Sequence, residues 1–144
     1  MSSGRATHEY CVLRVVPDIE RGEFLNVGVV LICRASRFLG CRIGLDRDRL
    51  RTLFPALDDE TVDLIEGHLA TIPLICAGDP AGGPIARLGL GERWHWLASP
   101  SSTMVQPGPV HTGLSADAEA ELERLFARFV GGAPPGRMLH GAEA

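Results

Sequence analysis

The sequence predicts an α+β fold, in which an antiparallel sheet packs against two to three helices. Two observations predict this class. The first half of the chain holds three short apolar stretches with strand-like alternation, separated by turn residues. The later segments place apolar residues at helical spacing instead. The length of 144 residues and the hydrophobic content of 45% suit one soluble globular domain, with its sheet covered mainly on one face.

An N-terminal three-stranded meander is predicted, with strands at residues 10–16, 24–33 and 38–45. The third strand alternates most clearly, because every second residue from Leu39 to Leu45 is apolar and shares one face. If the first hairpin closes symmetrically about Glu20, Arg14 pairs with Asn26 across the first two strands. The meander therefore brings an arginine and an asparagine side by side.

The chain then changes to helical spacing. Asp46 is the expected N-cap of a short helix that ends before Pro55, and Asp58 begins a longer helix. The segment "RWHWLA", residues 93–98, alternates again and predicts a later strand. One or two such later strands complete the predicted sheet.

Ser115 is the expected N-cap of the last helix, whose apolar stripe stops at Gly131. A single α+β domain is therefore expected over residues 9–131. Residues 1–8 are expected to be a disordered N-terminus, and the Gly- and Pro-rich residues 132–144 a flexible tail.

Charge and composition exclude several functions. The formal net charge of −4 disfavours nucleic-acid binding, which requires a basic face. All 14 basic residues are arginine, so no lysine is present to form a Schiff base or to complete a P-loop. Six of these arginines fall within residues 34–51, and they form either a solvated helix face or an anion-binding patch.

No cofactor or metal is expected. The four cysteines form no C-x-x-C pair, and the histidines show no H-x-x-x-H spacing. Gly89 and Gly91 do not complete a dinucleotide fingerprint, because Trp94 occupies its last position. The chain begins without a signal-like apolar segment and holds no run of membrane-spanning length, so a cytoplasmic location without membrane contact is expected.

The second strand carries the first candidate site. Its stretch "FLNVGVVL" holds Asn26 and Gly28, residue types that are depleted in strands, on the expected face of Phe24 and Val30. With Arg14 alongside, this face either binds a ligand in the room left by the glycine or is a structural polar pair beside a bulge.

The stretch "SPSSTMVQPGPVHTG", residues 99–113, carries the second candidate site. Its prolines stiffen an extended arm that is at best an edge or irregular strand. Its hydroxyls could face an anion, and His111 and Thr112 are expected near the start of the last helix. His95 is either a general base or ligand, or a hydrogen-bonded histidine at the core boundary. No G-x-S-x-G elbow supports a serine triad.

The blocks "YCVLRVVPDIERGEFLNVGVVLIC" and "LGERWHWLASPSSTMVQPGPVHTGL" together resemble the bacterial domain-of-unknown-function family number 3037. The positions that match its pattern are Arg14, Gly22, Glu23, Asn26, Gly28, His95, Gln106, Pro109, His111, Thr112 and Gly113. The family has no established activity. The resemblance implies a small bacterial protein encoded near HipA-like kinases, and therefore a kinase-like partner.

The leading hypothesis is a cytoplasmic binding or accessory module with regulatory function. Its recognition surface joins five side chains, with Thr112 as a sixth candidate: Arg14, Asn26, His95, Gln106 and His111. Arg14 would hold an anionic or carbonyl group. One alternative is a small hydrolase or phosphoryl-transfer enzyme with His111 as acid/base and Arg14 as anion stabiliser. Another is a structural or interaction protein without a small-molecule site. The oligomeric state stays open.

Overall fold

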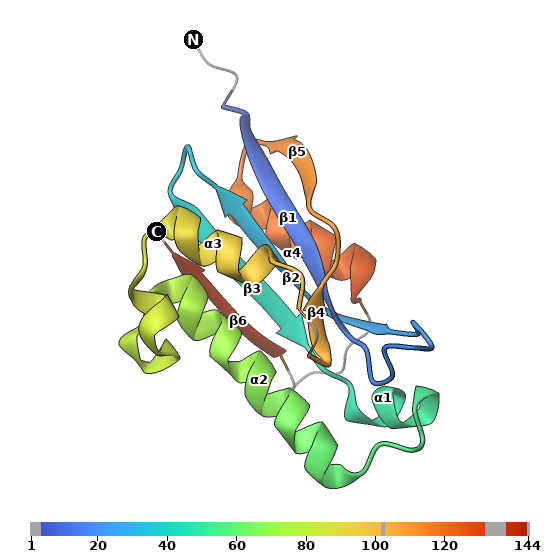
Figure 1. Ribbon diagram of the computed structural model, residues 1–144. Coiled ribbons are helices and arrows are strands. Elements are labelled where there is room, and N and C mark those ends of the chain that lie inside the picture. Colours follow the sequence, from blue (N-terminus) through green and yellow to red (C-terminus); the bar gives the residue numbers. More distant parts are fainter. Residues whose placement is uncertain (1–3, 102, 132–137, 144) are drawn as a thin grey trace.

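The computed structural model describes residues 4–101 and 103–131, and the backbone of residues 138–143. Its strands are β1 (Ala6–Val15), β2 (Leu25–Cys33), β3 (Phe38–Gly44), β4 (Val105–Pro107), β5 (His111–Ser115) and β6 (Met138–Glu143). Its helices are α1 (Arg47–Leu53), α2 (Asp59–Ala77), α3 (Leu90–Ala98) and α4 (Ala118–Phe129), with short 3₁₀ turns at Pro80–Gly82 and Pro84–Arg87. Figure 1 shows their order along the chain.

The described strands form one antiparallel sheet in the order β4-β1-β2-β3-β6, and β5 also pairs with β1. The α+β class and the N-terminal meander are therefore confirmed. β4 and β5 pair with different halves of β1, because Gly108–Val110 interrupt the pairing between them. The stiff arm is thus an irregular edge strand, as its prolines predicted.

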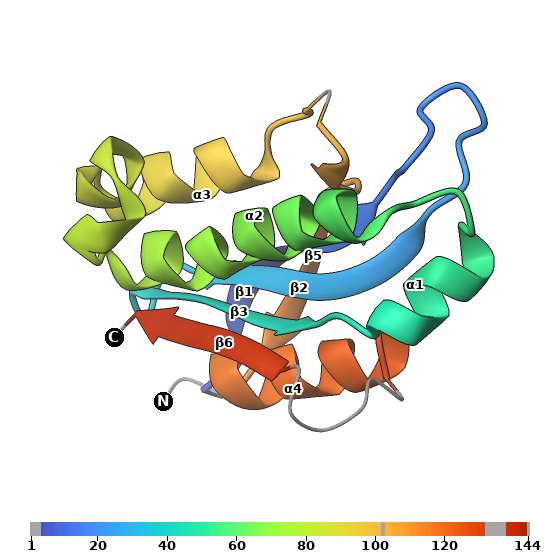
Figure 2. The same cartoon turned by 90° about the horizontal axis from the view of Figure 1, so that it is seen from below.

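Helices cover both faces of the sheet. Figure 2 shows α2 and α3 on one side and α4 on the other. A large apolar cluster joins the first side to α2 and α3, and a smaller one joins the second side to α4. The expectation of cover mainly on one face is wrong. β2 explains this, because it is buried on both faces and so needs apolar partners on both.

Residues 93–98 form part of helix α3, so the strand predicted there is wrong. Trp94 and Leu97 are three positions apart and both face the core, which is a helical spacing. The side chain of Glu92 accepts a hydrogen bond from the Gly89 N–H and so stabilises the first turn. Six residues of alternation are too few to distinguish a strand from a short helix.

The predicted N-caps Asp46 and Asp58 are confirmed, since each accepts a hydrogen bond from a backbone N–H in its helix. The third cap is wrong. Asp117, and not Ser115, caps α4, because its carboxylate reaches the N–H of Ala120. Ser115 ends β5 instead, and its hydroxyl contacts His8.

Both ends of the chain differ from the predicted boundaries. β1 begins at Ala6 and His8 is buried, although residues 1–8 were expected to be disordered. Residues 138–143 pair with β3 within the expected flexible tail. The remainder of these expectations, for residues 1–3, 132–137 and 144, lies outside the described residues.

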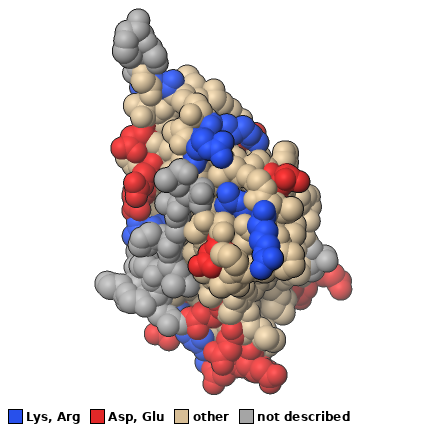
Figure 3. Space-filling model, turned by 90° about the vertical axis from the view of Figure 1, so that its left-hand side faces the viewer, with Lys and Arg blue, Asp and Glu red and all other residues tan. Residues whose placement is uncertain are grey.

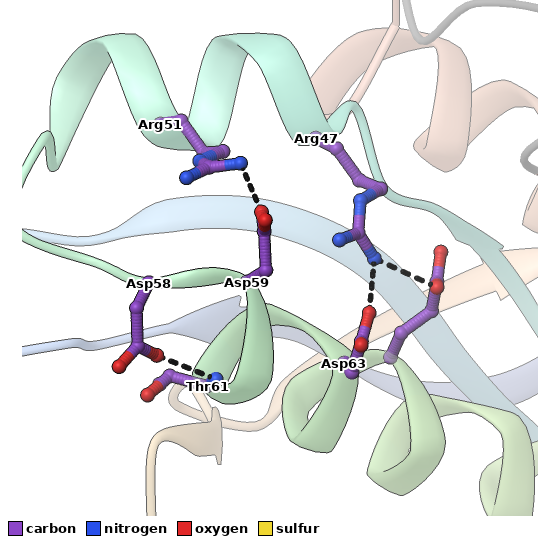
Figure 4. A network of polar contacts seen from close by, with 7 residues as sticks. Arg47, Arg51, Asp58, Asp59, Thr61 and Asp63 are labelled. Carbon is purple, nitrogen blue, oxygen red and sulfur yellow. Dashed lines mark hydrogen bonds and ion pairs between the residues drawn. The ribbon is translucent and has the colours of Figure 1, made fainter.

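The arginine-rich segment joins parts of this chain. Figure 4 shows Arg47 of α1 contacting Asp63 and a second acid of α2, Glu66, and Arg51 contacting Asp59. Arg34 and Arg42 pair with acids of β1 and α4. Figure 3 shows acidic side chains gathered at the lower end of the molecule, near the start of α2. The arginine cluster therefore largely neutralises acids of its own chain.

Candidate functional site

Three of the predicted site residues lie in one row across three neighbouring strands. Arg14 on β1 stands opposite Asn26 on β2 and opposite Gln106 on β4. Directly opposed residues of an antiparallel pair project to the same side of the sheet. The Asn26 amide donates a hydrogen bond to the Phe129 carbonyl at the end of α4, so the row lies on the α4 side. We call Arg14, Asn26 and Gln106 the polar row.

A β-bulge brings Asn26 into the polar row. Leu13 pairs with Gly28 but Arg14 pairs with Asn26, so β2 holds an extra residue, Val27, at this point. Beyond the bulge, Val30 and its alternate neighbours face α2. The prediction that Asn26 and Gly28 share a face is therefore wrong.

Gly28 leaves no room for a ligand. A Cβ at this position would lie 3.0 Å from the Arg42 carbonyl oxygen and 3.1 Å from Cγ1 of Ile43. The space is thus occupied by the neighbouring strand β3, which agrees with the structural interpretation of this glycine as part of a bulge.

The Arg14 guanidinium is held between an aromatic ring and the arm. Its central carbon lies 4.3 Å from the centroid of the Phe24 ring. On another side, a Cβ at Gly108 would lie 3.7 Å from the same carbon, so the arm backbone packs closely here. The N–H of Gly108 donates to the Val12 carbonyl and fixes this approach. The cation is therefore oriented before any ligand arrives.

Arg14 has donor capacity that the described residues do not use. Its Nε atom is buried and forms no hydrogen bond with residues 4–101 or 103–131. Within the same ranges no carboxylate forms an ion pair with it. A buried donor without an acceptor costs about 1–3 kcal/mol. Arg14 as a whole is only half-buried and has no carboxylate partner among the described residues, which makes it the centre of the candidate site.

Three hydroxyls in the described part of the arm, those of Ser99, Ser101 and Thr103, have structural partners. Ser99 donates to the His95 carbonyl, and Thr103 donates to the Val105 carbonyl while contacting the Ser101 hydroxyl. The Gln106 amide in turn donates to the Thr103 carbonyl. These bonds shape the turn that leads into β4. The anion contact expected of these hydroxyls is therefore replaced by contacts within the arm.

The other three predicted site residues lie away from the polar row. His111 stands opposite Tyr10, with ring centroids 5.3 Å apart, and Thr112 stands opposite Glu9. Tyr10 is four residues from Arg14 on β1, which is about 13 Å along a strand. His95 is exposed on α3, across the sheet from α4. The predicted surface therefore divides into a polar row and three separate residues.

A model of the protein family DUF3037, described as "Protein of unknown function (DUF3037)", matches residues 10–130. The chain belongs to this family. The match contains every residue of the polar row as well as Phe24 and Gly108, which sequence analysis did not assign to the site. No curated protein and no solved structure matches the chain.

This DUF3037 protein has a hollow on the side of the sheet opposite the polar row. A cavity of about 440 Å³ lies between α2, α3 and the arm, lined by His68, Trp96, Leu97, Ser101 and Thr103 among others. The arm thus borders both faces, with Gln106 on the side of α4 and Pro107 on the side of this cavity. Burial lowers the pKa of His68, which favours a neutral imidazole here.

His68 gives a pH prediction. Because its pKa in the folded DUF3037 protein lies below the ordinary 6.5, the unfolded chain binds the proton first as the pH falls. The contribution of His68 to the free energy of unfolding is therefore fully present above about pH 6.5, and it is lost as the pH falls from there through the folded-state pKa. We expect the melting temperature to drop from about pH 7.5 to about pH 5.5, and to drop less in His68→Gln.

The exposed His95 provides the control for this measurement. His95→Gln makes the same substitution at an exposed histidine, so a change in pH dependence that appears only in His68→Gln is specific to position 68. Part of the dependence should survive in His68→Gln, since burial also lowers the pKa of His8. If the melting temperatures of wild type and His68→Gln fall equally with pH, the prediction is contradicted.

Within the described residues, no cluster of three or more His, Cys, Asp or Glu side chains is arranged to bind a metal ion. Among the helices of those same residues, none has the length and apolar character needed to span a bilayer.

Proposed function

We propose that this DUF3037 protein is a binding module that recognises an anionic group, a carboxylate or a phosphate, at Arg14. The observation that supports this most directly is the buried Nε of Arg14, which lacks an acceptor among the described residues. A planar guanidinium presents paired N–H groups that match the oxygens of a carboxylate or phosphate. Phe24 and the arm hold this group in place, so little side-chain entropy is lost on binding.

The rest of the polar row supplies neutral contacts. One N–H of the Asn26 amide is used by the Phe129 carbonyl, which leaves its other amide N–H and its oxygen for a ligand. Gln106 is likewise anchored to the Thr103 carbonyl through one amide N–H, which leaves its other N–H and its oxygen for a ligand. Arg14 would thus provide the charge, and the two amides would provide orientation.

We propose further that the module acts in the bacterial cytoplasm as an accessory or regulatory protein, with a kinase-like protein as its partner. The support is the family membership, because the resemblance to this family implies a protein encoded near HipA-like kinases. An acidic or phosphorylated side chain of such a partner has the charge that Arg14 would accept. Co-purification of a kinase-like protein with the wild type, and its loss with Arg14→Gln, is the expected result.

The ligand experiment is a thermal shift assay with inorganic phosphate and with acetate as probes. A ligand at about ten times its Kd stabilises the folded protein by about 1.4 kcal/mol. For a domain of this size the melting temperature should then rise by about 4–6 °C. We expect this rise in the wild type and its absence in Arg14→Gln.

Arg21→Gln is the matched control, because Arg21 is an exposed arginine that is paired with Glu23 in the adjacent turn. This variant should respond to the probes as the wild type does. Equal responses of the Arg14 and Arg21 variants would defeat the proposal. So would a wild type that responds to neither probe while Arg14→Gln melts far below it, since Arg14 would then be purely structural.

A further inference from the structure

His8, near the start of β1, joins three elements through its imidazole. It is 2% exposed and faces Ser115 at the end of β5 and Glu121 in α4. Its Nδ1 lies 3.0 Å from the Ser115 Oγ, and its Nε2 lies 3.6 Å from the Glu121 Oε2. In the sequence, His8 lies in the expected disordered N-terminus and Ser115 at the expected helix cap, so no local pattern linked either residue to chemistry.

The surrounding charges determine which nitrogen carries the proton. Arg124 donates two hydrogen bonds to Glu121 and lowers the pKa of this carboxyl, which therefore stays ionised. An anion beside Nε2 favours the tautomer with the proton on Nε2. Nδ1 is then free to accept a proton from the Ser115 hydroxyl. Burial lowers the pKa of His8 and so maintains the neutral imidazole that a base requires.

Gly113 leaves the space that the imidazole occupies. It stands opposite His8 in the sheet, and a Cβ at this position would lie 2.9 Å from both Cε1 and Nε2 of His8. Any other residue at position 113 would push the ring from its place between Ser115 and Glu121. The position of the base therefore depends on a glycine two residues before the serine.

Ser115 also borders a cavity that is large enough for a small substrate. This hollow of about 380 Å³ is lined by the apolar side chains of Ala6 and Phe38 and by the first residues of α4. The N–H groups of Ala118 and Glu119 belong to the first turn of α4, where no carbonyl of the helix can accept from them. Such groups stabilise negative charge on a neighbouring oxygen.

We propose that Ser115, His8 and Glu121 form a catalytic relay that hydrolyses small carboxylic esters. Ser115 is the nucleophile, His8 is the general base and then the general acid, and Glu121 is a positioning residue that acts through His8. The relay is defined by its geometry, with Nδ1 within hydrogen-bond distance of the serine. Nε2 faces the carboxylate at 3.6 Å and forms no hydrogen bond with the described residues, so Glu121 acts on it through its charge. The relay uses none of the polar row, so it is independent of the proposed anion binding.

In the first step the Ser115 Oγ bonds to the ester carbonyl carbon while its proton passes to Nδ1 of His8. The carbonyl electron pair moves to its oxygen as this bond forms. When the pair returns, the bond to the alcohol oxygen breaks, and that oxygen takes the proton from Nδ1. Water then gives a proton to Nδ1 and bonds to the acyl carbon. The Ser115 ester bond breaks, Oγ recovers the proton, and a carboxylic acid leaves.

The test uses the full chain with p-nitrophenyl acetate as substrate and a fluorophosphonate as a serine-directed label. We expect hydrolysis above the rate of free buffer, and one covalent label that peptide mass spectrometry locates at Ser115. In Ser115→Ala the rate above background should fall by at least about 100-fold. Ser36→Ala is the matched control, because Ser36 lines the same cavity but bonds to the Cys33 carbonyl.

Two positioning variants separate catalysis from a structural role. Gly113→Ala should lower kcat by about tenfold or more, since small displacements of a catalytic group are costly. In Glu121→Gln the pH of half-maximal rate should move down, because the carboxylate that raises the pKa of His8 is gone. Arg21→Gln, at an exposed arginine outside both proposed sites, should hydrolyse the substrate as the wild type does. Because the relay contains no residue of the polar row, the proposed anion binding and the relay can fail separately.

The relay is overturned if wild-type protein carries no label at Ser115, or if Ser115→Ala hydrolyses the substrate at the wild-type rate. The labelling of wild type needs no substitution, so it decides the question even if a variant fails to fold. A wild type without turnover, whose Ser115→Ala variant only melts earlier, would show that the three residues merely join β1, β5 and α4.

Discussion

Replacing Arg93 by alanine is expected to lower the free energy of unfolding by about 3–5 kcal/mol. Arg93 is 6% exposed, and it donates hydrogen bonds to the carbonyls of Ile75 and Cys76 at the end of α2 and of Leu88 beyond it. Helix carbonyls at this end have no partner within the helix. The Ile75 carbonyl keeps a hydrogen bond from the Gly78 N–H in the variant. The Cys76 and Leu88 carbonyls lose their Arg93 donor, at a cost of about 1–3 kcal/mol each.

Urea unfolding of wild type and Arg93→Ala measures this loss, with an unchanged m-value indicating that only stability has changed. The melting temperature should fall by roughly 10–15 °C. Arg87→Ala, at an exposed arginine in the preceding 3₁₀ turn, is the control and should stay within about 0.5 kcal/mol of wild type. Equal stabilities of the two variants would show that Arg93 does not anchor the end of α2.

Leu69→Ala is expected to cost about 2–5 kcal/mol, through lost apolar burial and the cavity left behind. Leu69 is 1% exposed on the side of α2 that packs against the sheet. Leu64 lies on the same helix but is 70% exposed, so Leu64→Ala makes the identical change in solvent. Both substitutions change the helix propensity by the same amount, so the difference between the two variants isolates the effect of burial.

Chemical denaturation of the pair provides the measurement. The Leu69 variant should unfold at a clearly lower urea concentration, while the Leu64 variant should unfold close to wild type or slightly above it, because alanine favours helix. Similar midpoints for both variants would mean that α2 is loosely packed. The large apolar cluster between α2 and the sheet would then not be the main source of stability.

The sequence predicted the central pairing of the candidate site correctly. Local hairpin symmetry about Glu20 placed Arg14 opposite Asn26, because the register of a hairpin follows from its turn. The prolines of the arm likewise predicted an edge strand. Both features depend on residues close together in the sequence, or on the backbone restrictions of a single residue type.

Other parts of the site could not be predicted from local patterns. The bulge at Val27 changes the face of Asn26, and β3 lies close to the neighbouring Gly28. His111 was expected beside Arg14, but the interruption at Gly108–Val110 places it opposite Tyr10 instead. The relay of His8, Ser115 and Glu121 joins residues up to 113 positions apart, so no spacing in the sequence reveals it.

The sequence by itself determined the α+β class, the meander, the helix N-caps at Asp46 and Asp58 and the family. These depend on periodicity, capping chemistry and motifs, which act over a few residues. Only the tertiary structure decided that helices cover both faces of the sheet and that Arg93 holds the end of α2. It alone brought His8 to Ser115. The reason is physical: burial and hydrogen-bond partners come from distant segments, and local propensity yields to them when the core forms.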